Sequence, residues 1–63
     1  MAITLKAARI NVKMNQREAA KRIGISAETL SNYERGKSFP DIQTLQRIEQ
    51  VYGVTYSDLI FLP

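Results

Sequence analysis

Residues 15–37, NQREAAKRIGISAETLSNYERGK, make up more than a third of a 63-residue chain and hold most of its structural information. Its apolar positions are small and sparse, which leaves much of its surface for something other than packing. Asn15 and Glu18 have the N-cap and N3 spacing of a capping box, so a helix is predicted to begin at Asn15. Gly24 is predicted to end that helix in the left-handed conformation of a tight turn, and Ser26 to cap the next one. The stretch therefore predicts two short helices joined at Gly24.

Two longer helical patterns flank this pair. Apolar residues at three- and four-residue spacing predict a first helix over 4–12. Asp41 is the predicted cap of a fourth helix, which Gly53 ends. The apolar stripes of these two helices are Leu5, Ala8 and Val12, and Ile42, Leu45, Ile48, Val51 and Tyr52.

The last residues predict a fifth, short helix. Thr55 and Asp58 have the spacing of a second capping box, and Leu59 and Ile60 follow as apolar residues. No segment shows the sustained alternation that is typical of strands. We therefore expect an all-α fold, a compact five-helix bundle that forms a single domain over residues 1–63.

Composition excludes several classes of chemistry. The chain has no cysteine and no histidine, so disulfides, thiolate or zinc sites, and Ser-His or Cys-His catalysis are ruled out. We expect no enzyme activity, no metal and no cofactor. No apolar run approaches the ~18 residues of a membrane span, and the N-terminus does not resemble a signal peptide, so a cytoplasmic protein is expected. A net charge of +3 and a pI near 9.6 suit a polyanionic partner such as nucleic acid.

The third predicted helix has an unusual outward side. With Leu30 set as the inward direction, steps of about 100° per residue separate the two sides. The outward side has no large apolar residue, and such a surface fits a major groove about 12 Å wide. A merely solvated side is the alternative, although solvated helices are usually richer in Lys and Glu than in Ser, Thr and Asn. The outward residues are Glu28, Ser31, Asn32 and Arg35, with Ala27 and Thr29 on the flanks.

Residues 14–54, MNQREAAKRIGISAETLSNYERGKSFPDIQTLQRIEQVYGV, resemble the helix-turn-helix domain of lambda-type phage repressors and Cro proteins, the Cro/C1 or XRE family. The shared features are the NQ entry, A-x-x-x-G-I-S, the YERGK ending, the P-D pair and the YGV that follows the fourth helix. The resemblance implies a lambda repressor-like five-helix fold that binds operator DNA, usually as a dimer. Ala19 departs from the family's common leucine and thins the core. We expect no second domain of the kind that longer phage repressors carry, so the chain resembles the short Cro-like or controller-type members.

The resemblance also implies which residues read DNA bases. Ala27, Glu28 and Asn32 match the base-facing positions, with Thr29 and Ser31 in support. Asn32 can pair with adenine, and Ala27 can touch a thymine methyl group. Glu28 can accept from cytosine N4, or it can simply stabilise the N-terminus of its helix.

Other matching positions imply backbone contacts and an internal ion pair. Gln16 matches a glutamine that contacts a phosphate and braces the reading helix; a polar residue near a helix cap is the alternative. Arg9 and Glu34 match an ion pair inside the fold. For the basic residues taken singly, a solvated surface charge is the alternative. The remaining backbone candidates are Lys13, Arg17, Ser26, Arg35, Lys37 and Ser38.

The tail predicts self-association. Tyr56, Phe61 and Leu62 exceed what so small a core needs, although they can also just cover the end of the bundle. The sequence thus predicts a homodimeric, sequence-specific regulator of double-stranded DNA, a repressor of phage, prophage or bacterial origin. It would read the major groove with residues 27–35 and act at the nucleoid. The alternative is a protein-interaction module, antitoxin-like or anti-repressor, on the same scaffold.

Overall fold

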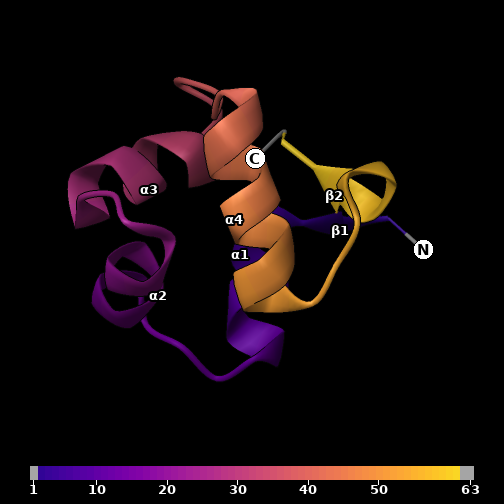
Figure 1. Ribbon diagram of the computed structural model, residues 1–63, viewed down its shortest axis with the longest axis horizontal. Helices are drawn as coiled ribbons and strands as arrows, with labels where there is room; N and C mark the ends of the chain where they lie inside the picture. Colours follow the sequence, from indigo (N-terminus) through magenta and orange to yellow (C-terminus); the bar gives the residue numbers. More distant parts are fainter. Residues whose placement is uncertain (1, 62–63) are drawn as a thin grey trace.

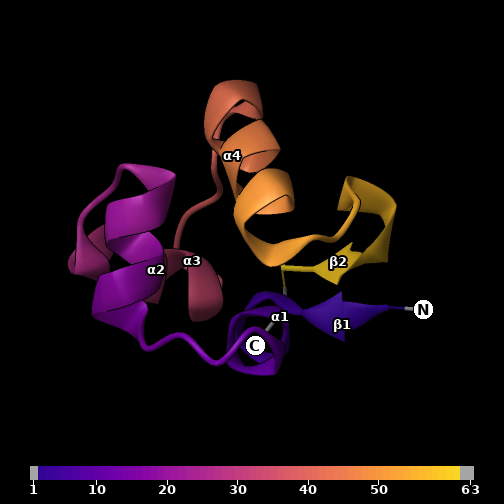
Figure 2. The same ribbon diagram turned by 60° about the horizontal axis from the view of Figure 1, so that its bottom comes forward.

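The computed structural model describes residues 2–61 and shows four α-helices and a small pair of strands in this range. The molecule measures 27 × 23 × 20 Å. The second and third helices lie together on one side of it, and the strand pair lies on the opposite side (Figure 1). The first and fourth helices lie between them (Figure 2). In chain order the elements are β1 (Ile3–Thr4), α1 (Leu5–Asn11), α2 (Gln16–Ile23), α3 (Ala27–Glu34), α4 (Ile42–Tyr52), a 3₁₀ turn (Tyr56–Asp58) and β2 (Leu59–Ile60).

The predicted helix-turn-helix pair is confirmed at both helix starts and at the turn between the helices. Asn15 Oδ1 accepts from the Glu18 backbone N–H at 2.8 Å, and Glu18 Oε1 accepts from the Asn15 backbone N–H at 3.4 Å. This reciprocal box satisfies two donors that the first turn of α2 would otherwise leave unpaired. Gly24 follows α2 with φ 89°. Ser26 Oγ then accepts from the Thr29 backbone N–H at 3.0 Å and caps α3.

The Asn15 cap can be tested by stability. Replacing Asn15 by alanine should lower the free energy of unfolding by about 1 kcal/mol, because it leaves the Glu18 N–H without its acceptor. Urea unfolding followed by circular dichroism measures this loss. Gln43, exposed on the outer side of α4, gives the control: Gln43→Ala should change the same free energy by less than about 0.5 kcal/mol. Equal losses in the two variants would contradict a stabilising box.

The hydrophobic core draws on all four helices. Ala19 and Ala20 are 0% and 2% exposed, and α2 packs against both α3 and α4. Their small side chains allow this close approach. The other buried apolar residues are Leu5, Ala8, Ile23, Leu30, Tyr33, Ile48 and Tyr52.

The predicted fifth helix is wrong, and the structure has strands that the sequence did not predict. The Thr55 hydroxyl donates to the Asp58 carboxylate at 3.0 Å instead of accepting the Asp58 N–H. That N–H bonds to the Thr55 carbonyl at 2.9 Å, which closes a single tight 3₁₀ turn. The chain then runs extended and pairs in parallel with β1. The register places Ile3 beside Leu59 and Thr4 beside Ile60.

The predicted apolar stripe of α4 is wrong at its first residue. Ile42 is 75% exposed, whereas Ile48 is fully buried. At about 100° per residue, Ile42 lies about 120° around the helix from Ile48. Thr44 lies only about 40° from Ile48, and it is 9% exposed. The first turn of α4 therefore buries a threonine and leaves the isoleucine outside.

Candidate nucleic-acid interface

The outer face of α3 comprises Ala27, Glu28, Thr29, Ser31, Asn32 and Arg35. The opposite side of the helix is buried, since Leu30 and Tyr33 are 0% and 8% exposed. On the outer face, Glu28 and Arg35 are exposed and the other four residues are half-buried. The predicted division of this helix into two sides is therefore confirmed. None of the six residues of the outer face is fully buried, although Ala27 packs partly against the core.

At the N-terminal end of this face, two hydroxyl groups are linked. Ser26 Oγ donates to Thr29 Oγ1 at 2.8 Å while it accepts the Thr29 backbone N–H at 3.0 Å. The Ser26 proton is thus committed within the cap. Thr29 is the better donor to an outside oxygen, because its own hydroxyl proton is not used in the Ser26 bond.

At the C-terminal end of this face, a cation is bound to an amide. Arg35 Nη2 donates to Asn32 Oδ1 at 2.9 Å. The two residues are three positions apart, which places them one above the other on the helix. One of the two lone pairs of the Asn32 amide oxygen is therefore used by a guanidinium, and most of the hydrogen-bonding groups that remain free on this pair are donors.

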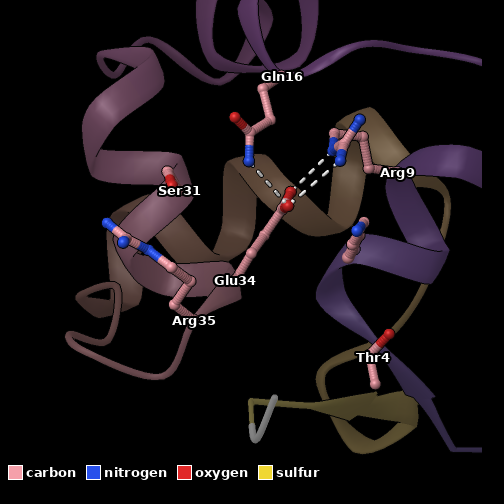
Figure 3. A pocket seen from close by; sticks show the side chains of 7 residues that line it. Thr4, Arg9, Gln16, Ser31, Glu34 and Arg35 are labelled. Carbon is pink, nitrogen blue, oxygen red and sulfur yellow. Dashed lines mark hydrogen bonds and ion pairs between the residues drawn. The ribbon is translucent and has the colours of Figure 1, made fainter.

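A hollow of about 730 Å³ lies beside α3, between this helix and α1 (Figure 3). We call it the α1–α3 hollow. It brings together three predicted DNA-contacting residues, Gln16, Ser31 and Arg35. Its other lining residues are Thr4, Lys6, Arg9 and Glu34.

An ion pair holds the wall of the hollow. Arg9 Nε donates to Glu34 Oε2 at 2.7 Å, and Arg9 Nη2 donates to Glu34 Oε1 at 3.2 Å. Gln16 Nε2 donates to the same Oε1 at 3.0 Å, and Arg9 Nη1 donates to the Met14 carbonyl at 2.9 Å. The side chains of Arg9 and Glu34 are 10% and 4% exposed. The hydrogen bond to Glu34 raises the pKa of Arg9, although burial opposes the shift. The network ties α1 and the start of α2 to the end of α3 (Figure 3).

The other predicted backbone residues do not line this hollow. Lys13, Arg17 and Lys37 are exposed, and Ser38 is half-buried. Lys13 lies in the connection between α1 and α2 with φ 59°, Arg17 lies in the first turn of α2, and Lys37 follows α3.

Lys6 was not predicted as a site residue, but it is exposed and lines the hollow with Arg35. One signal was available. Lys6 precedes Arg9 by three residues, so the two side chains lie on the same side of α1. The sequence could not predict that α3 lies next to the side of α1 that carries Lys6 and Arg9.

The carboxylates near these elements have structural roles. Asp41 Oδ1 accepts from the Thr44 backbone N–H at 2.8 Å, and this bond lowers the pKa of Asp41. Glu49 Oε2 accepts from the Tyr56 backbone N–H at 2.7 Å. Within residues 2–61, no group of three acidic side chains lies close enough to hold a metal ion. In the same range no helix is long and apolar enough to cross a membrane.

Tyr52 is buried beside this network with an unpaired hydroxyl. Its side chain is 4% exposed, and no group of the described residues lies within hydrogen-bond distance of Oη. Burial, with a smaller contribution from Glu34, raises the pKa of Tyr52 to about 12. The folded chain therefore keeps a proton that the unfolded chain loses near pH 10. Stability from this group is complete below pH 10 and is lost as the pH rises to about 12.

Tyr52→Phe tests this assignment. The variant should lose stability less steeply than the wild type between pH 10 and 12. At pH 7 it should be equally stable or slightly more stable, because an unpaired buried hydroxyl is removed. Tyr56→Phe is the matched control, since Tyr56 is 61% exposed, and it should keep the wild-type pH dependence. Thermal melts across this range measure both variants, and a destabilised Tyr52→Phe at pH 7 would show that the hydroxyl has a partner.

A second surface, the apolar patch, consists of Phe39, Ile42, Tyr56 and Phe61. The first three are 64%, 75% and 61% exposed. Phe39 and Phe61 make an edge-to-face contact with ring centroids 6.3 Å apart. Phe61 also packs against the core, so it partly covers the end of the bundle. Leu62, predicted with Tyr56 and Phe61 to form a dimer interface, lies outside the described residues.

Comparison with known proteins places these features in a family. The family model described as Helix-turn-helix matches residues 5–59. The chain is 33% identical over 52 residues to the cryptic phage CTXphi transcriptional repressor RstR of Vibrio cholerae, which covers 82% of this chain and 47% of RstR. It is 39% identical over 56 residues to the HTH-type transcriptional regulator ImmR of Bacillus subtilis, which covers 89% of this chain and 44% of ImmR.

A third relative matches over most of its own length. An uncharacterized HTH-type transcriptional regulator of Archaeoglobus fulgidus is 32% identical over 59 residues, covering 94% of this chain and 83% of that protein. The chain spans less than half the length of RstR and ImmR. No solved structure gives a significant match. The extent of the family match and the helix-turn-helix geometry agree, and the chain belongs to the Cro/C1-type (XRE) helix-turn-helix family of transcription regulators.

Proposed function

We propose that this chain binds double-stranded DNA sequence-specifically by placing the outer face of α3 in the major groove. The observation that supports this most directly is that the outer face has five polar or charged side chains and no fully buried residue, while the opposite side of α3 is buried. An α-helix with its side chains is about 10–12 Å across, which matches a major groove about 12 Å wide. Short side chains on such a face let the helix approach the base edges.

Base reading is assigned to Ala27, Glu28, Thr29, Ser31 and Asn32. Ala27 offers a methyl group, the chemistry that meets thymine, and the exposed Glu28 offers an acceptor for cytosine N4. Thr29 and Ser31 offer hydroxyl groups, which serve either as donors or as acceptors.

Backbone contacts are assigned to the residues that surround this face. Gln16 gives one amide N–H to Glu34, and its second N–H remains for a phosphate. Exposed cations provide attraction that does not depend on sequence. Those proposed are Lys13, Arg17 and Lys37, together with Lys6 on the wall of the α1–α3 hollow; Ser26 and Ser38 are polar candidates at the two ends of α3.

The proposed regulator is a homodimeric repressor that acts at the nucleoid in the cytoplasm. One short helix reads only a few base pairs, and two-fold dimers of such proteins bind half-sites about one helical turn apart. The apolar patch suits a contact between two copies, because exposed aromatic and aliphatic residues gather on it. RstR is named as a transcriptional repressor, which supports the same role for this chain.

Selection from a random pool of duplexes tests the proposal. The full chain should enrich a short motif, repeated in inverted orientation about 10 base pairs apart if it binds as a dimer. A variant with Glu28, Ser31 and Asn32 all replaced by alanine should keep its fold but enrich no motif. Enrichment of the same motif by this variant would remove α3 as the reading helix. If the wild type binds no duplex, the protein-interaction alternative takes its place, with the apolar patch as the contact surface.

A further inference from the structure

We infer that Asn32 and Arg35 form a donor-rich unit that reads a guanine, with Arg35 as the base contact and Asn32 as its positioning residue. The inference rests on the proposed function, because it needs α3 in the major groove. It assigns a base contact to Arg35, for which a contact with the DNA backbone was predicted. It also replaces the expected Asn32–adenine contact.

The geometry that carries the inference is the hydrogen bond between the two side chains. Arg35 Nη2 donates to Asn32 Oδ1 at 2.9 Å. Asn32 is half-buried on α3, whereas Arg35 is exposed. The Asn32 amide can therefore hold the longer and more mobile Arg35 side chain against the helix. The N–H groups of the guanidinium are then already oriented before DNA binds.

The electrostatic surroundings leave this guanidinium available. Among the described residues, Glu34 is the carboxylate that lines the same hollow, and it is bound by Arg9 and Gln16. Arg35 makes no ion pair with a described carboxylate. Its charge is therefore not neutralised within the described part of the chain, and the remaining guanidinium N–H groups can donate to an outside acceptor.

The donor and acceptor pattern selects the base. Adenine presents N7 as an acceptor and N6–H as a donor in the major groove, so a bidentate asparagine must accept through Oδ1. Here one of the two lone pairs of Oδ1 already accepts from Arg35, so an adenine N6–H that approached the other would also face the donors of the guanidinium. Guanine presents two acceptors, N7 and O6, which match the N–H groups that the guanidinium keeps free. Phosphate oxygens are also acceptors, so the experiment must separate a base from the backbone.

The position along the helix suits a separate base pair. Asn32 follows Glu28 by four residues, or about 6 Å along the axis at 1.5 Å per residue. That distance is close to two base-pair steps of 3.4 Å. The unit should therefore read a base pair that lies beyond those met by the N-terminal half of α3.

The experiment measures affinities for a selected duplex and its single-base-pair variants, using the wild type, Asn32→Ala, Arg35→Ala and the double variant. The wild type should prefer G·C at one position by about 5- to 150-fold. Both single variants should lose that preference at the same position, and the double variant should lose no more of it than either one. Replacing the guanine by 7-deazaguanine, which lacks the N7 acceptor, should weaken the wild type but not Arg35→Ala.

Asn32→Asp separates positioning from direct reading. Aspartate keeps an acceptor for Arg35 but has no amide N–H, so it should keep the guanine preference even if total affinity falls. Lys37→Gln is the control, and it should weaken all duplexes by the same factor. Circular dichroism should show an unchanged fold in each variant, because all the altered side chains are outside the core.

Several outcomes would overturn the inference. Loss of preference at two different positions, with additive effects, would make Asn32 and Arg35 independent readers. An equal loss on every duplex for Arg35→Ala would make Arg35 a phosphate contact. Unchanged base preferences in all variants would show that the Asn32–Arg35 bond has no part in DNA reading. If the wild type binds DNA without preference or does not bind it, the major-groove proposal itself fails and this inference fails with it.

Discussion

Replacing Glu34 by alanine is expected to lower the free energy of unfolding by about 3–5 kcal/mol. The change leaves the Arg9 guanidinium buried without its counter-charge, and an unpaired buried charge costs far more than a lost surface contact. It also removes the acceptor of the Gln16 amide. A domain of this length is stabilised by about 3–9 kcal/mol in total, so the variant should be partly unfolded at 25 °C. Urea unfolding and thermal melts followed by circular dichroism measure the loss.

Two further variants make the test specific. Glu28→Ala removes an exposed carboxylate from the same helix and should cost less than about 1 kcal/mol. Replacing both partners, Arg9→Met with Glu34→Leu, removes the charges together and should be more stable than Glu34→Ala alone. A Glu34→Ala variant as stable as Glu28→Ala would show that the pair contributes nothing to folding.

The ion pair also links stability to the proposed interface. Arg9 comes from α1, Gln16 from the start of α2 and Glu34 from the end of α3, so one network fixes three elements around the α1–α3 hollow. Gln16 has both a structural and a proposed functional role, because one of its amide N–H groups donates to Glu34 and the other remains free for a phosphate. The orientation of α3, the proposed reading helix, therefore depends on Glu34, which is not proposed to contact any base.

Local signals explain why the helix-turn-helix could be predicted from the sequence. A cap is a contact between residues two or three positions apart, so Asn15, Ser26 and Asp41 identify helix starts without any knowledge of the fold. The division of α3 depends only on the helical period and on a buried Leu30. The Arg9–Glu34 pair spans 25 residues and was available only through the resemblance to a family.

The errors fall where distant segments meet. The tail forms β2 because it pairs with β1, more than fifty residues earlier, and a strand of two residues cannot show an alternating pattern. Ile42 is exposed because the packing around Ile48 determines which side of α4 faces the core. The hydrophobicity of the first turn does not determine it. The meeting of Lys6 with Arg35 at one hollow likewise depends on how α1 and α3 are placed, which no local pattern contains.

The second large effect is expected from salt. Four exposed cations are proposed to contact phosphates: Lys6, Lys13, Arg17 and Lys37. Each contact releases condensed counterions, so the logarithm of affinity should fall with the logarithm of salt concentration at a slope of about −3.6 per subunit. Between 50 and 200 mM salt, affinity per subunit should fall by about 150-fold. Fluorescence anisotropy on a labelled duplex gives the slope directly.

Single charge removals show which cations carry this slope. Lys37→Gln should make it shallower by about 0.9 and should weaken matched and mismatched duplexes alike, because a phosphate contact has no sequence preference. Arg22→Gln is the control: Arg22 is also exposed, but it lies about 140° around α2 from Arg17. It should leave the slope unchanged, since a charge that touches no phosphate releases no condensed counterion. Equal slopes for Lys37→Gln and the wild type would remove Lys37 from the interface. A wild-type slope near zero would show that the basic charge of the chain does not face DNA, and the whole assignment of α3 to the groove would lose its electrostatic basis.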